Sequence, residues 1–229
     1  MAEERLDKTF DVLVENEVIE LVLPENIKQN LRYEARPYQI EAFARFTYYL
    51  NKYKHRRKPS QLLFHMATGS GKTLIMAGAI VELYKMGYRN FIFFVNTDTI
   101  IRKTKENFLN SASLKYLFAQ QININNQPVS VREVDNFESV NDNDINIHFS
   151  TIQGLHSRLN TPRENSVTFE DFANKKIVLI SDEAHHVNSL TKQKLTGEEL
   201  EVERSWENTI TRIFDSNSDN VMLEFTATL

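Results

Sequence analysis

The sequence of 229 residues contains no cysteine. Disulfide bonds, thiolate metal sites and thiol redox chemistry are therefore excluded, and this composition suits the cytoplasm, which is the compartment that we expect. Glycine and proline are also scarce, with six and five residues. Because these two residue types mark most tight turns, the few positions where they occur are informative.

Long hydrophobic runs are missing as well. No apolar stretch approaches the ~18 residues of a membrane-spanning helix. The first residues, MAEERLDKTF, are acidic and polar, whereas a secretory signal peptide would be basic and then apolar. We therefore expect no membrane partner. The formal net charge of −4 gives no general attraction to nucleic acid, so such binding would need a local surface.

Most of the chain alternates short apolar segments with longer amphipathic ones, which predicts an α/β fold with a mainly parallel sheet and helices on both faces. Strands are predicted at Gln61–His65, Phe91–Val95, Val129–Val134, Ile145–Ser150, Ile177–Ile180 and Val221–Phe225. Helices are predicted from Pro37, at Lys72–Met86 and Thr97–Asn110, from Ile152, and around Trp206–Phe214.

Two regions break this alternation. Residues 1–35 place apolar side chains at alternating positions around Pro24, which predicts a lead-in of short strands, or an irregular lead-in, before a domain at 36–229. Residues 120–146 are rich in asparagine, glutamine and aspartate, which predicts a loop or an insertion at the sheet edge.

The segment MATGSGKT, residues 66–73, follows a predicted strand and precedes a predicted helix. Gly69 and Gly71 allow the backbone to curl so that its N–H groups meet phosphate oxygens at the positive end of the helix. In such a loop Lys72 reaches the β and γ phosphates and the Thr73 hydroxyl binds Mg²⁺. The first position is Met66 where the usual pattern has glycine. The candidate cofactor-binding residues are Thr68, Gly69, Ser70, Gly71, Lys72 and Thr73.

A second motif, SDEAH, follows the apolar strand at 177–180. We expect Asp182 to hold Mg²⁺ together with Thr73, and Glu183 to orient the attacking water, which makes Lys72, Asp182 and Glu183 the candidate catalytic residues. The alternative for the two acids is a solvated turn. His185 is expected to hydrogen-bond toward the segment Phe225–Thr228 rather than to bind a metal with its neighbour, because adjacent side chains point in different directions.

Two weaker patterns lie near the ends of the chain. Arg36-Pro37-Tyr38-Gln39 begins a predicted helix and offers an amide that can read an adenine edge and an aromatic ring that can stack. Its alternative is a helix cap with a buried tyrosine. The segment Phe225-Thr226-Ala227-Thr228 follows the last strand, where small hydroxyl side chains can link a hydrolytic site to a moving neighbour.

In chain order, RPYQ (36–39), MATGSGKT (66–73), FVNT (94–97), FSTIQ (149–153), SDEAH (181–185) and FTAT (225–228) resemble the successive motifs of superfamily 2 helicases and translocases. The motor subunit of type III restriction enzymes is especially similar. The resemblance implies a RecA-like fold, ATP and Mg²⁺ as cofactors, and DNA, in duplex form, as a partner.

The resemblance also implies roles for single residues. Gln39 would recognise adenine, and Thr226 and Thr228, with His185, would couple hydrolysis to movement. The positions that match nucleic-acid contacts of the family are Asn96, Thr97, Ser150, Thr151 and Gln153. An alternative role for these five residues is helix capping.

In the family the active site lies between two lobes, and the second lobe supplies an arginine. We therefore expect the first lobe of a larger enzyme, nearly inactive in hydrolysis alone, whose partners are the second lobe and a modification or specificity subunit. An RNA helicase lobe and a non-catalytic, ATP-dependent binding module are the alternatives.

Overall fold

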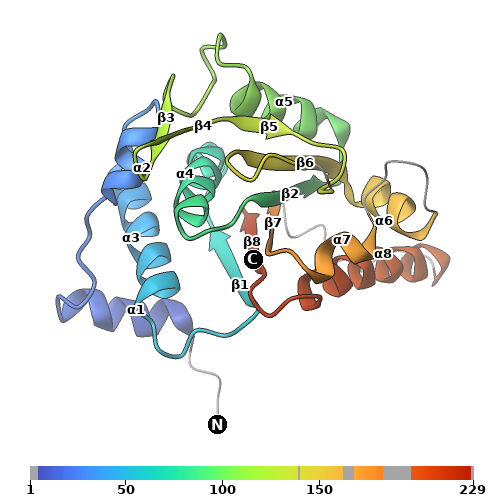
Figure 1. Cartoon of the computed structure of the whole chain (residues 1–229). Coiled ribbons are helices and arrows are strands. Elements are labelled where there is room, and N and C mark those ends of the chain that lie inside the picture. Colours follow the sequence, from blue (N-terminus) through green and yellow to red (C-terminus); the bar gives the residue numbers. More distant parts are fainter. Residues whose placement is uncertain (1–4, 139, 162–167, 183–196, 228–229) are drawn as a thin grey trace.

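A computed structural model describes residues 5–138, 140–161, 168–182 and 197–227 (Figure 1). The helices are α1 (Leu6–Glu15), α2 (Glu25–Asn30), α3 (Pro37–Asn51), α4 (Lys72–Lys85), α5 (Asp98–Leu109), α6 (Ile152–Asn160), α7 (Phe169–Ala173) and α8 (Gly197–Asp215). The strands are β1 (Ser60–His65), β2 (Asn90–Val95), β3 (Ile122–Ile124), β4 (Gln127–Val129), β5 (Val131–Glu133), β6 (Ile145–Thr151), β7 (Ile177–Asp182) and β8 (Val221–Thr226).

Six of these strands form one sheet in the order β1-β8-β7-β2-β6-β5, and every neighbouring pair is parallel. This topology confirms the predicted α/β class. Parallel pairing has a consequence for function, because the carboxyl ends of all six strands lie along the same edge of the sheet.

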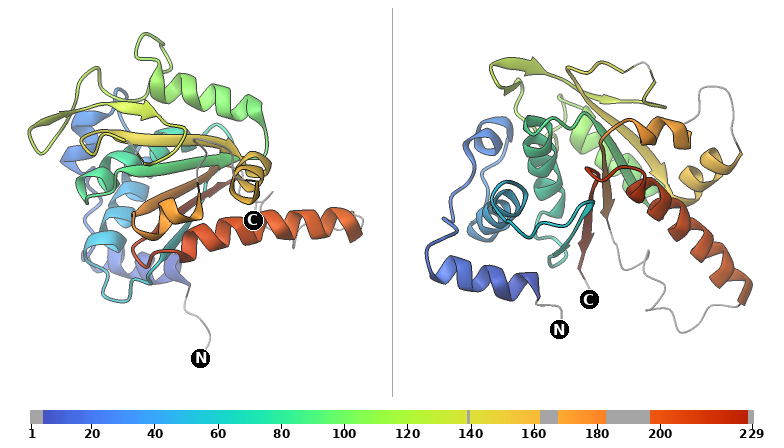
Figure 2. Two further views of the ribbon diagram at one scale, coloured as in Figure 1. Left: turned by 45° about the vertical axis from the view of Figure 1, so that its right-hand side comes forward. Right: turned by 60° about the horizontal axis from the view of Figure 1, so that its bottom comes forward.

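Side chains of successive strand residues point to opposite faces, and each face has its own core. In β2, Phe91 and Phe93 belong to the cluster that packs under α3, α4 and α5, whereas Ile92 and Phe94 belong to the cluster under α6, α7 and α8. The right-hand view of Figure 2 shows α4 on one side of the sheet and α8 on the other. Burial on both faces explains why the strand at 177–180 is a continuous apolar run.

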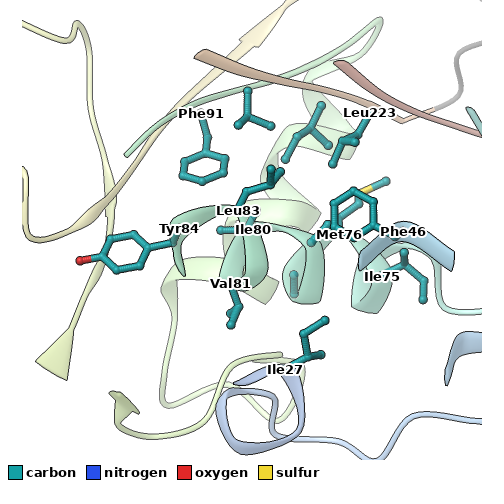
Figure 3. Packing of buried hydrophobic residues seen from close by; sticks show 14 of the residues in the cluster. Ile27, Phe46, Ile75, Met76, Ile80, Val81, Leu83, Tyr84, Phe91 and Leu223 are labelled. Atoms are coloured by element: carbon teal, nitrogen blue, oxygen red, sulfur yellow. The ribbon is translucent and has the colours of Figure 1, made fainter. Parts of the chain in front are cut away.

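The helix α4 follows the P-loop, residues 66–73, and is buried on nearly all sides, from Leu74 to Tyr84. Figure 3 shows its side chains between the sheet, represented by Phe91 and Leu223, and the N-terminal helices, represented by Ile27 and Phe46. A helix with no solvated face is typical of a domain core. Its position is therefore fixed from both sides, and so is the start of α4, where the P-loop ends.

The prediction of short strands in residues 1–35 was wrong, because this region forms α1 and α2. The side chains that pack inward from α1, Leu6, Phe10 and Leu13, are spaced as on one helix face. The Phe10 ring contacts Tyr48, 5.8 Å away, and Tyr53, 5.5 Å away, between ring centroids. The alternating pattern was misleading because several of the apolar residues in this region are exposed, such as Val12, Val18 and Leu21.

Residues 120–146 lie at the sheet edge, as predicted. They contain β5, the last strand of the sheet, and the antiparallel pair β3–β4. The buried Asn30 of α2 holds this pair, since its amide donates to the Asn123 carbonyl at 3.0 Å and its oxygen accepts from the Asn123 N–H at 2.7 Å. None of the described helices is long and apolar enough to cross a membrane.

The close approach of α3 and α4 gives a prediction for stability. A Cβ atom on Gly78 would lie 2.4 Å from two ring carbons of Phe43, which is fully buried, and 3.0 Å from Ile27. We expect Gly78→Ala to lower the free energy of unfolding by about 1–2 kcal/mol, since overpacking costs more than the helix propensity that alanine adds. Denaturant unfolding measures this change.

The matched variant is Phe43→Leu, which shortens the side chain that Gly78→Ala meets. The double variant should lose less stability than the sum of the two single losses, because the two sites are in contact. A stability gain for Gly78→Ala alone would contradict the close packing.

Candidate functional site

The P-loop connects the end of β1 to the start of α4. Gly69 and Gly71 adopt φ angles of 76° and 82°, in the left-handed region that favours glycine, and Gly71 is the N-cap of α4. The loop therefore curls directly above the N-terminus of a buried helix. This is the arrangement that phosphate groups require, because unpaired backbone N–H groups and the positive end of the helix dipole meet there.

The first turn of α3 supports this loop from one side. The Ser70 carbonyl accepts two hydrogen bonds, from the Tyr38 hydroxyl at 2.8 Å and from the Gln39 amide Nε2 at 2.9 Å. The Gln39 oxygen in turn accepts from the Arg36 N–H at 2.9 Å. Both ends of the Gln39 amide are thus engaged with backbone groups, which stabilises the start of α3 and the loop together.

Gln39 is also buried, with 3% of its surface exposed. A Cβ atom on Gly71 would lie 2.5 Å from its Nε2 atom, so the amide occupies the space directly beside the loop. The structure therefore places the expected adenine-reading side chain against the loop. Tyr38, the expected stacking residue, is 41% exposed, and its hydroxyl also contacts the loop, which its expected role did not include.

Two polar side chains of the P-loop, those of Lys72 and Ser70, indicate that the loop binds a ligand. The Lys72 ammonium donates to the Met66 carbonyl across the loop at 3.4 Å, so its charge lies over the loop opening. The Ser70 hydroxyl oxygen is buried and has no hydrogen-bond partner in the described part of the chain. A cation and an orphaned hydroxyl fit an anionic ligand with many acceptor oxygens, such as a polyphosphate.

The order of the strands brings the second and third motifs to the same edge. Thr226 of β8 pairs with His65 of β1, and Phe225 pairs with Asp182 of β7. The Met66 N–H donates to the Thr226 carbonyl at 2.9 Å, so the hydrogen bonding between β1 and β8 extends to the first residue of the P-loop. Asp182 is half-buried at the end of its strand.

The side-chain types of Thr73 and Asp182 suit a magnesium ion. Thr73, half-buried in the first turn of α4, and Asp182 offer hydroxyl and carboxylate oxygens, the ligand types that Mg²⁺ prefers together with phosphate oxygens. Within the described ranges there is no group of three or more His, Asp and Glu side chains that could hold a metal. Glu183, His185 and Thr228 lie outside the described residues.

Sequence reasoning missed two buried polar groups beneath this edge. The Ser181 hydroxyl, next to Asp182, is fully buried and lacks a hydrogen-bond partner among the described residues. Glu224 pairs with Ser181 across the strands and accepts from the Gln61 amide at 2.7 Å. Burial raises the pKa of the Glu224 carboxyl above its ordinary value. Their proximity follows from the pairing of β7 with β8, so no local sequence pattern predicts it.

The candidate nucleic-acid residues gather farther along the same edge. Thr151, at the end of β6, lies beside Val95, at the end of β2, and Asn96 and Thr97 follow directly. Asn96, Thr97 and Gln153 are exposed.

The helix-capping alternative holds for one of these residues. The Thr151 hydroxyl accepts from the Gly154 N–H at 3.0 Å and so caps α6. Thr97 occupies the N-cap position of α5, but its side chain makes no capping hydrogen bond in the described structure. Ser150 is buried, with 6% of its surface exposed. Asn96, Thr97 and Gln153 are therefore the exposed members of the five, whereas Thr151 is half-buried.

A family model described as the Res subunit of type III restriction enzymes matches residues 32–229. The probable type III restriction-modification enzyme HindVIP Res subunit of Haemophilus influenzae is 36% identical, and the alignment covers 90% of this chain and 45% of that protein. This chain thus spans less than half the length of that curated relative.

Two solved structures are similar at low identity. The Sulfolobus solfataricus SWI2/SNF2 ATPase core in complex with dsDNA is 14% identical with a TM-score of 0.47, covering 92% of this chain and 34% of that chain. A nuclease-deletion mutant of the type ISP restriction-modification enzyme LlaGI with a DNA substrate mimic is 16% identical with a TM-score of 0.42, covering 86% and 18%.

The contacts of Gln39 give a prediction that separates two roles. If its amide positions the P-loop, Gln39→Ala weakens the binding of Mg²⁺-ATP and of Mg²⁺-tripolyphosphate by similar factors, at least about fivefold, because two hydrogen bonds are lost. If it reads adenine, only ATP binding weakens. Calorimetric titration of both ligands decides between these outcomes, with Gln29→Ala on the exposed surface of α2 as the control.

Proposed function

Because the chain belongs to the family of type III restriction enzyme Res subunits, we propose that it is the ATP-binding N-terminal motor lobe of a DNA helicase or translocase of that type. The observation that carries the proposal is the shared sheet edge, where β1, β8 and β7 bring the P-loop, Thr226 and Asp182 together. The family match includes all three of these segments.

Each part of this edge has a chemical task in the proposal. Lys72 binds the β and γ phosphates, and the Thr73 hydroxyl and the Asp182 carboxylate hold Mg²⁺, which neutralises the charge that develops on the phosphates. Glu183 orients the attacking water. Tyr38 and Gln39 hold the loop through the Ser70 carbonyl, so the phosphate site keeps its shape before the nucleotide enters.

The partner in the proposal is duplex DNA, whose phosphates are contacted by Asn96, Thr97 and Gln153. Ser150 and Thr151 support these contacts from within the sheet edge and the α6 cap. Coupling to hydrolysis runs through Thr226, whose carbonyl is bonded to the first residue of the P-loop, and through His185 and Thr228. The remaining length of such a protein would supply a second lobe, and a modification subunit would be a further partner.

Lys72 provides the direct test of nucleotide binding. We expect Lys72→Ala to weaken Mg²⁺-ATP binding at least about tenfold, or ~1.4 kcal/mol, because its ammonium is the side-chain cation over the loop opening. Calorimetric titration measures the affinity. Lys85→Ala is the matched control, since Lys85 is an exposed lysine in the last turn of the same helix. Equal affinities for the wild-type chain and Lys72→Ala would contradict the assigned role.

A second prediction concerns turnover. We expect this chain to bind ATP but to hydrolyse it slowly and with little response to DNA, since an arginine supplied from a second lobe is worth about 10³ to 10⁵ in the rate of phosphoryl transfer. Steady-state phosphate release, with and without duplex DNA, is measured beside the full-length protein. If this chain alone matched the DNA-stimulated rate of the full-length protein, a second lobe would not be needed for catalysis.

A further inference from the structure

A concentration of basic side chains lies at the amino ends of the strands, at the sheet edge opposite the P-loop. Residues 42–81 contain no aspartate or glutamate, and within them the loop between α3 and β1 has the sequence KYKHRRK, residues 52–58. In Figure 1 this loop ends beside the loop between α8 and β8. Since a strand rises about 3.3 Å per residue, β1 separates the loop from the P-loop by roughly 20 Å.

One cation of this run has a structural role. The Arg56 guanidinium donates to the Leu50 carbonyl at 3.0 Å, near the end of α3, and to the Ser60 hydroxyl at 2.8 Å, at the start of β1. These bonds fix the path of the loop between the two elements, and one of them satisfies a carbonyl at the helix end. The remaining basic side chains of the run are exposed, at positions 52, 54, 55, 57 and 58.

A second element extends the basic surface. The Lys58 ammonium lies 2.8 Å from the Asp219 carboxylate, and the ammonium of Lys176, directly before β7, lies 3.3 Å from the same group. The two lysine side chains are still 57% and 48% exposed. Two cations and one carboxylate leave a net positive charge, so this cluster continues the surface of the loop to the start of β7. We call the whole surface the amino edge; its residues are Lys52, Lys54, His55, Arg57, Lys58, Lys175 and Lys176.

The chemistry of the amino edge fits a polyanion with evenly spaced charges. Its cations are carried by an exposed loop and by the entry to a strand, and long side chains of this kind can adjust to successive phosphates. Duplex DNA presents one negative charge per about 1.7 Å of its axis. The Tyr53 ring packs against Tyr49 and Phe10, at 5.7 and 5.5 Å between centroids, and is therefore engaged within the protein. Contacts with phosphates rather than with bases are what this surface offers.

We propose that the amino edge binds the phosphate backbone of duplex DNA, as a second site apart from Asn96, Thr97 and Gln153 at the opposite edge. The inference rests on the proposed function, since it takes duplex DNA as the partner of this lobe. Because the net charge of the chain is −4, DNA binding needs a local concentration of cations, and the amino edge provides one. Such binding is independent of base sequence and weakens with salt.

The test removes one cation from each element of the surface, in the variant Lys54→Ala/Lys176→Ala. The variant Lys54→Arg/Lys176→Arg keeps both charges. The matched control is Lys28→Ala/Lys115→Ala, which removes two exposed lysines from α2 and from the loop after α5. Fluorescence anisotropy of a labelled DNA duplex, titrated with the 229-residue chain at several salt concentrations, measures the affinity. Calorimetric titration with Mg²⁺-ATP is done on each variant, and circular dichroism verifies that each is folded.

We expect the alanine pair at the amino edge to weaken duplex binding at least about fivefold and to reduce the slope of log K against log salt by about 2, because two phosphate contacts are lost. The arginine pair and the control should stay within about twofold of the wild-type chain. Affinity for Mg²⁺-ATP should be the same in all of them, since the P-loop lies at the other end of β1.

Unchanged duplex affinity in the alanine pair would overturn the inference, and so would an equal loss in the control or a wild-type chain that binds no duplex. Poly-glutamate is the competing probe. If it bound more tightly than the duplex and lost affinity in the same alanine pair, the surface would fit an acidic protein segment and the inference would be wrong. A wild-type chain that binds the duplex through the amino edge but does not bind Mg²⁺-ATP would instead contradict the proposed function.

Discussion

Parallel pairing of β1, β8 and β7 is the constraint on which the site depends. The last strand in the described chain lies between the first and the seventh, so residues more than a hundred positions apart end side by side. The registers of Thr226 with His65 and of Phe225 with Asp182 fix the end of β1, where the P-loop begins, relative to Asp182. A slip of one residue would turn Asp182 to the opposite face, because side chains alternate along a strand.

The helix α4 packs against the sheet and stabilises the position of the P-loop at this edge. It is buried from Leu74 to Tyr84, and the missing side chain at Gly78 allows the Phe43 ring of α3 to approach its backbone. The start of α3 is thereby fixed relative to the start of α4. This explains how Tyr38 and Gln39 can both reach the Ser70 carbonyl, and it makes the phosphate site a product of core packing as well as of the loop sequence.

The sequence predicted the sheet and the P-loop because both follow from local rules. Strands buried on both faces are continuous apolar runs, as at 177–180, and glycines at 69 and 71 permit the positive φ angles that the loop adopts. The lead-in was predicted wrongly because exposed apolar residues such as Val18 imitated a strand pattern. The partner of Gln39 could not be predicted, since a hydrogen bond to a backbone carbonyl 31 residues away depends on how α3 packs. The same holds for Glu224 and Ser181, whose proximity is a property of the sheet.

These contacts connect the P-loop to an exposed aromatic side chain through one turn of α3. Tyr38 lies at this junction, because its hydroxyl donates to the Ser70 carbonyl while its side chain lines a cleft of about 790 Å³ between α1, α3 and β1. Displacement of the Tyr38 side chain would remove one of the two hydrogen bonds on that carbonyl and leave only the one from Gln39. Phosphates that rotated the Ser70 carbonyl would release both side chains at once. The position of the Tyr38 side chain and the position of the P-loop are therefore coupled through the Ser70 carbonyl, to which the buried Gln39 amide also donates.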